Sequence, residues 1–184
     1  MMPNIWEWLT LLSKLLFYLG LASSIGGFFT LALLARHKNV IEHIVFYIRA
    51  GALLGLLATG LGFLIQVGAF AENGIIGMFD QMFIDVLWQS SVGDASGMRL
   101  LGFVLLWVGT YDISRFVHNL SFNLYALGHV GTVVAGTILL IYSFSLIGHL
   151  ADADTVGKIA IGLHALAMCL WLGSLYPLWF ISRG

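Results

Sequence analysis

The chain has 184 residues, of which 60 % are hydrophobic and 9 % are charged. Ordinary soluble proteins have roughly 45–50 % and about 25 %, and so few charges could not cover the surface of a soluble domain. A net charge of −1 without a basic run argues against nucleic-acid binding, and a single cysteine excludes an intramolecular disulfide. The composition predicts an all-α, polytopic membrane protein with one transmembrane domain over residues 1–184.

Uncharged runs recur along the chain, and a membrane-spanning helix needs roughly 20 apolar residues. We expect five such helices, at about residues 12–35, 45–71, 97–118, 121–148 and 156–181. The third reaches that length only by continuing through Asp112. Four small residues lie on one face of the second helix and would let its backbone approach a neighbour closely: Gly51, Gly55, Ala58 and Gly62.

The basic residues indicate an orientation, because cytoplasmic connections are enriched in Lys and Arg. One predicted side of the membrane carries Arg36, Lys38, Arg49, Arg115 and Arg183, and the other carries Lys14, Arg99 and Lys158. This bias predicts an N-terminus outside and a cytoplasmic C-terminus. We expect Lys14 and Arg99 to extend toward the outer interface, as long basic side chains do near helix ends.

The longest connection, about residues 72–96, falls on the outer side in this topology. Apolar residues recur in it with helical spacing, namely Ile75, Met78, Phe79, Met82, Phe83 and Val86. This pattern predicts a short amphipathic helix that lies on the membrane or over the mouth of the bundle.

The last helix carries the clearest chemical pattern. His164, Met168 and Trp171 are spaced i, i+4, i+7 and share one face. Methionine suits Cu(I), imidazole also suits copper, and an ionisable residue inside a membrane is by default a functional candidate. The alternative is a histidine that bonds to a neighbouring helix beside a methionine that fills space. Cys169 lies on another face and is expected in the core.

A second histidine, His149, ends the fourth helix on the same outer side. His149 and His164 belong to sequential antiparallel helices, so they could converge on one ion or one cofactor. Alternatively, His149 is a helix-terminal residue that interacts favourably with the helix dipole. Met78 and Met82 also fall on the outer side, where thioethers suit copper capture, although methionine is common at membrane interfaces for packing alone.

The stretches 143–149 and 163–175, SFSLIGH and LHALAMCLWLGSL, resemble the copper resistance protein D (CopD) family and its pattern "GHA … HLLAAxxWxGGL". The spacing from His164 to Trp171 and Gly173 matches, and Ser174 stands at the second glycine. The resemblance implies a bacterial inner-membrane protein, not an enzyme. It would move copper from the periplasm toward the cytoplasm, often with a periplasmic copper chaperone. From the chemistry of the residues themselves, we expect His149, His164 and Met168 to hold the copper ion at the mouth of the bundle, and outer methionines such as Met78 and Met82 to concentrate it there.

The same helix resembles the small haem-dependent protoporphyrinogen oxidases, whose helix carries a similar His…Trp-x-Gly pattern. Two histidines on facing helices can ligate haem iron, so a b-type haem redox protein is the alternative hypothesis. A third alternative is a structural subunit whose histidines only pack. The chain has no phosphate-binding loop, nucleophile elbow or HExxH motif.

Overall fold

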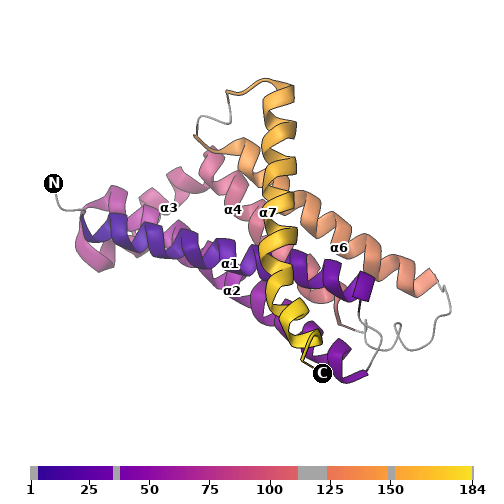
Figure 1. Cartoon of the computed structure of the whole chain (residues 1–184). Coiled ribbons are helices and arrows are strands. Elements are labelled where there is room, and N and C mark those ends of the chain that lie inside the picture. The colour runs from indigo at the N-terminus through magenta and orange to yellow at the C-terminus, as the bar shows by residue number, and fades with distance from the viewer. Residues whose placement is uncertain (1–3, 35–37, 112–123, 149–151, 184) are drawn as a thin grey trace.

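The computed structural model describes residues 4–34, 38–111, 124–148 and 152–183 (Figure 1). The elements in these segments are all helical: α1 (Ile5–Leu34), α2 (Lys38–Ala71), the 3₁₀ helix η1 (Gly74–Phe79), α3 (Gln81–Trp88), α4 (Ser91–Gly109), α6 (Leu124–Tyr142), the 3₁₀ helix η2 (Ser143–Leu146) and α7 (Thr155–Ile181). Within the described residues, five helices are long and apolar enough to cross a membrane: α1, α2, α4, α6 and α7. The predicted all-α, multi-pass membrane class with five spans is confirmed.

The helix bounds differ from those expected from hydropathy. α1 begins at Ile5 and α2 at Lys38, well before residues 12 and 45, because backbone hydrogen bonding continues a helix beyond its apolar part. α4 also begins early, since the Ser90 side chain caps it by accepting from the Val92 amide. α4 ends at Gly109, so the expected span through Asp112 is wrong. Asp112 itself lies outside the described residues.

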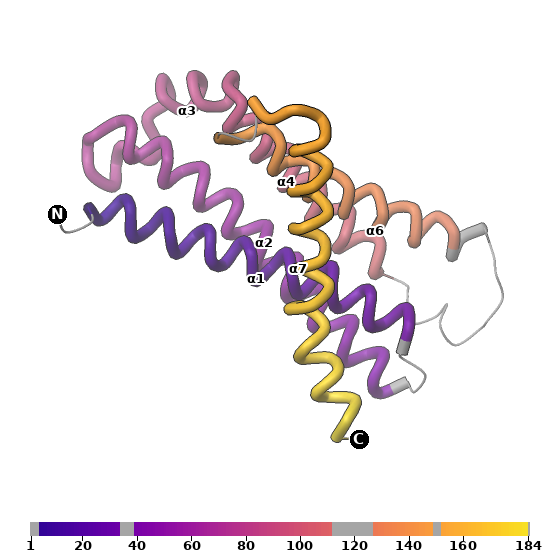
Figure 2. Tube along the Cα trace, turned by 45° about the horizontal axis from the view of Figure 1, so that its top comes forward, coloured from indigo at the N-terminus to yellow at the C-terminus, as the bar shows by residue number. Residues whose placement is uncertain are grey.

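The long helices form two side-by-side pairs and one crossing helix (Figures 1 and 2). α1 packs on α2, and α4 packs on α6, while α2 joins the two pairs by its contacts with α4. α7 crosses α1 steeply in both views and extends beyond it at both ends. α1, α2, α4 and α6 alternate in direction along the chain (Figure 1).

Glycines allow these helices to approach at backbone distance. A Cβ at Gly20 of α1 would lie 2.7 Å from the Gly51 carbonyl oxygen and 2.5 Å from the Gly55 amide nitrogen of α2. The predicted small-residue face of the second helix is therefore confirmed as a packing face. The α1–α7 crossing is equally tight, because a Cβ at Gly26 would lie 2.6 Å from the Cα of Gly173.

One apolar cluster fills the centre of the bundle, and all five long helices contribute to it. Its buried members are Phe17, Leu21, Ile25, Ala52, Ala58, Phe103, Leu106, Val133, Leu140 and Cys169. The expectation that Cys169 belongs to the core is confirmed, since the residue is 6 % exposed. Two of its members, Phe17 and Ala58, also line the cavity described below.

The connection between α2 and α4 contains η1 and α3 rather than one continuous amphipathic helix. Asp80 separates them and caps α3, since its side chain accepts from the amides of Met82 and Phe83. The buried Leu87 and the partly buried Phe83 anchor this segment, because they pack with Phe63 and Val67 of α2. The outer members of the predicted stripe, Ile75, Phe79, Met82 and Val86, are 76 %, 67 %, 63 % and 61 % exposed. They face away from the bundle, so the segment does not cover its mouth with this stripe.

The glycine contacts predict a selective effect of added methyl groups. In Gly173→Ala, the new Cβ would collide with the Ala22 backbone of α1, and we expect a loss of about 1–3 kcal/mol, typical of overpacking. Gly60→Ala is the matched control, because a Cβ there meets nothing within 4 Å. Thermal unfolding of the detergent-purified chain should show a lower midpoint for the first variant only. Equal midpoints would contradict the crossing.

Candidate functional site

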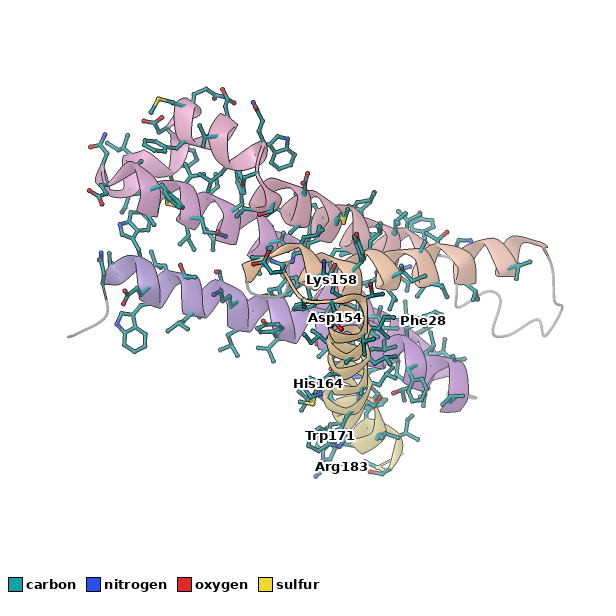
Figure 3. All side chains as sticks on the ribbon, turned by 90° about the horizontal axis from the view of Figure 1, so that it is seen from above. Phe28, Asp154, Lys158, His164, Trp171 and Arg183 are labelled. Carbon is teal, nitrogen blue, oxygen red and sulfur yellow. The ribbon has the colours of Figure 1, made fainter. Side chains whose placement is uncertain are left out.

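The predicted copper ligands on the last helix lie on an uncovered face of α7. His164 is exposed and Met168 is 37 % exposed, one helical turn apart on the same helix. The His164 ring has no hydrogen-bond partner among the described residues. In Figure 3, His164 lies on α7 between Lys158 and Trp171. His149, the other predicted histidine, lies outside the described residues.

The predicted outer methionines lie on other elements. Met78 belongs to η1 and is partly buried beside Gly68 and Trp6, whereas Met82 belongs to α3 and is 63 % exposed. η1 and α3 pack on α2 and α4, while α7 packs mainly on α1. The fold therefore does not gather these methionines around His164. Within the described residues, no three His, Cys, Asp or Glu side chains come together as a metal site.

A polar cavity that sequence analysis did not identify lies between α1, α2, α4 and the segment that contains η2. Its volume is about 340 Å³. It is lined by Thr10, Ser13, Lys14, Phe17, Tyr18, Ala58, Thr59, Gly62, Phe63, Gln66, Ser96, Arg99, Phe144 and Ile147. The lining includes two cations and no carboxylate, so the cavity suits an anion and repels a cation.

Arg99 enters this cavity from α4. Its Nε donates to the Ser143 hydroxyl of η2 at 3.0 Å, and its guanidinium carbon lies 4.6 Å from the Phe17 ring centre and 5.6 Å from that of Phe144. The two aromatic faces attract the cation and fix its plane. A hydroxyl and two aromatic rings from other helices therefore hold the Arg99 side chain.

The remaining polar lining residues differ in whether their donors are already used. Thr10, Ser13 and Thr59 donate to carbonyls of their own helices, and Gln66 donates to the Gly62 carbonyl at 3.3 Å. The Lys14 ammonium and the Ser96 hydroxyl have no partner among the described residues. The cavity therefore contains unused donors on two different helices.

A sequence signal for the cavity existed. Thr10, Ser13, Lys14 and Tyr18 recur at helical spacing along an apolar helix, and Ser96 and Arg99 are spaced i, i+3 on α4. Hydropathy averages over these positions, and only the packing of α1 and α4 on α2 brings the polar residues to one cavity.

The opposite end of the bundle contains polar contacts that support the fold. One Nη of Arg49 donates to the carbonyls of Thr110 and Tyr111 at 2.7 Å each, and so satisfies acceptors left free at the end of α4. The Nε2 of His43 lies 2.7 Å from the Tyr176 hydroxyl. This contact links α2 to α7.

These features define a multi-pass helical membrane protein with a cationic cavity at one end and a histidine–methionine pair on an uncovered face of α7. Comparison with protein-family models, curated proteins and solved structures finds no match to this chain. The resemblance to the CopD family therefore stays a prediction from the sequence.

The charge of the cavity predicts how it reacts with thiol reagents. Cys169 is the chain's one cysteine and is buried, so it provides an unreactive background. We expect the cysteine of Ser96→Cys to favour an anionic methanethiosulfonate over a cationic one, because Lys14 and Arg99 attract anions. The measured quantity is the ratio of the two reaction rates. The rate ratio is normalised to Gln89→Cys, an exposed position after α3.

Leu61→Cys is the control for reagent access, because Leu61 precedes the cavity-lining Gly62 but is 45 % exposed on the outside of the bundle. In a membrane this position would face lipid, and we expect little reaction with either charged reagent. A Ser96→Cys ratio equal to that of Gln89→Cys would show that the cavity carries no positive potential.

Proposed function

We propose that the protein transports copper across a bacterial inner membrane, from the periplasm toward the cytoplasm, and that His164 and Met168 bind the ion. One observation carries the proposal: an uncovered imidazole and an uncovered thioether lie one turn apart within an apolar helix. The resemblance of residues 143–149 and 163–175 to the CopD family supports it independently of the fold.

The depth of the pair supports a functional role. His164 follows the first residue of α7, Thr155, by nine positions, which corresponds to roughly 13–14 Å of helix rise. An imidazole at that depth is costly to leave without a partner in hydrocarbon. A bound soft cation would give it one.

The donor chemistry suits Cu(I). Imidazole nitrogen and thioether sulfur both bind this ion, whereas hard cations prefer oxygen. Two ligands from one helix leave the coordination incomplete, so we assign the remaining position to His149, which precedes α7 in the chain. Met78 and Met82 are proposed to capture copper from a periplasmic copper chaperone rather than to share the final site, since they lie on different elements.

The charge of the cavity separates it from the copper route. Lys14 and Arg99 would repel a copper cation, so the copper route is proposed to avoid this cavity.

Copper titration of the purified chain tests the proposal. Competition with a Cu(I) chelator should give one tight site in the wild type, and at least about tenfold weaker binding, or 1.4 kcal/mol, in His164→Ala and in the near-isosteric Met168→Leu. Leu163→Ala is the control, since Leu163 is next to His164, is 62 % exposed and has no atom that can bind copper. The two ligand variants should also lower copper accumulation by cells.

Absence of Cu(I) binding by the wild type, or unchanged uptake with His164→Ala, would overturn the proposal. An absorption spectrum of the same preparation distinguishes the haem alternative. A Soret band in the wild type that disappears in His164→Ala would show that His164 binds haem b, and the haem hypothesis would then replace the copper one.

A further inference from the structure

We infer that the cavity between α1, α2, α4 and η2 binds a phosphate-bearing anion, supplied either by an acidic phospholipid headgroup or by free phosphate. The inference does not depend on the proposed copper function. It rests on donors that line one cavity and have no partner among the described residues: the two terminal nitrogens of Arg99, the Lys14 ammonium and the Ser96 hydroxyl.

The first argument is the uncompensated charge. No described carboxylate pairs with Lys14 or Arg99, and the acid nearest to Arg99 on α4, Asp94, is exposed. Arg99 follows Ser91 by eight positions, which corresponds to roughly 12 Å of helix rise. A cation at that depth in a membrane-spanning helix requires a counter-charge or water.

The second argument is the orientation of the guanidinium. Ser143 holds Nε at 3.0 Å, and Ser143 is itself 0 % exposed and donates to the Leu140 carbonyl at 2.7 Å. Phe17 and Phe144 fix the plane of the group. Neither terminal nitrogen has a hydrogen-bond partner among the described residues, and neither is fully buried. Such a fork matches the two oxygens of a phosphate.

The third argument is the composition of the cavity wall. Ser96 lies one turn from Arg99 on the same face of α4, and Lys14 adds a second positive charge from α1. Phe63, Ala58 and Ile147 supply apolar surface beside these donors. A volume of about 340 Å³ is within the range of small-molecule sites. Charged donors beside apolar surface suit a headgroup together with the first part of its acyl chains.

Ligand-dependent thermal stability of the full chain in neutral detergent tests the inference. The probes are phosphatidylglycerol, zwitterionic phosphatidylcholine and inorganic phosphate, each added alone. We expect phosphatidylglycerol to raise the unfolding midpoint more than phosphatidylcholine does. Native mass spectrometry should show retained lipid. A similar rise with inorganic phosphate would assign the site to the free anion.

Variants test which residues carry the effect. Arg99→Gln and Lys14→Gln should each weaken binding of the anion by about tenfold or more, while Ser96→Ala should weaken it less. Arg183→Gln is the matched control, because it removes one positive charge at the exposed C-terminal end and should leave the response unchanged. If Arg99→Gln does not fold, Lys14→Gln and Ser96→Ala provide the test.

Two results would overturn the inference. One is a wild-type unfolding midpoint that shows no selectivity for the anion. Such a midpoint responds to none of the three probes, or it responds equally to phosphatidylglycerol and phosphatidylcholine and not to phosphate. The other is a response that Arg183→Gln lowers as much as Lys14→Gln does, because the binding would then follow net charge rather than the cavity.

Discussion

The close approach of α1 to two other helix backbones is the constraint on which the rest of the structure depends. Gly20 faces Gly51 and Gly55 of α2, and Gly26 faces Gly173 of α7. In hydrocarbon, helices gain little from the hydrophobic effect, so close packing and interhelical hydrogen bonds hold them together. Because α1 is held at these points, its residues Ser13 and Lys14 line the cavity together with residues of α2 and α4.

Two kinds of chemistry are kept apart by this arrangement. The cavity side of α1 collects positive charge and hydroxyl groups around Arg99, which suits anions. The α7 side presents soft donors, His164 and Met168, on a surface that the described helices leave uncovered. A copper ion and a phosphate would therefore bind different parts of the molecule, and each can be lost without the other.

The sequence predicted the class, the number of spans, the small-residue face of the second helix and the burial of Cys169, because these depend on composition and local spacing. It predicted helix ends less well, since a cap such as Ser90 or Asp80 acts through one side-chain hydrogen bond that hydropathy does not register. It also missed the environment of Arg99, whose partners Phe17 and Ser143 lie on other helices.

The sequence by itself determined that the protein is a helical membrane protein, with five candidate spans in the part of the chain that the structure describes, and that His164 and Met168 share a face. Apolar length and helical period are local properties. Only the tertiary structure decided that Met78 and Met82 lie away from those residues and that Lys14 and Arg99 meet in one cavity. The reason is physical: the helix period places residues on a face, but only the packing of helices decides what that face contacts.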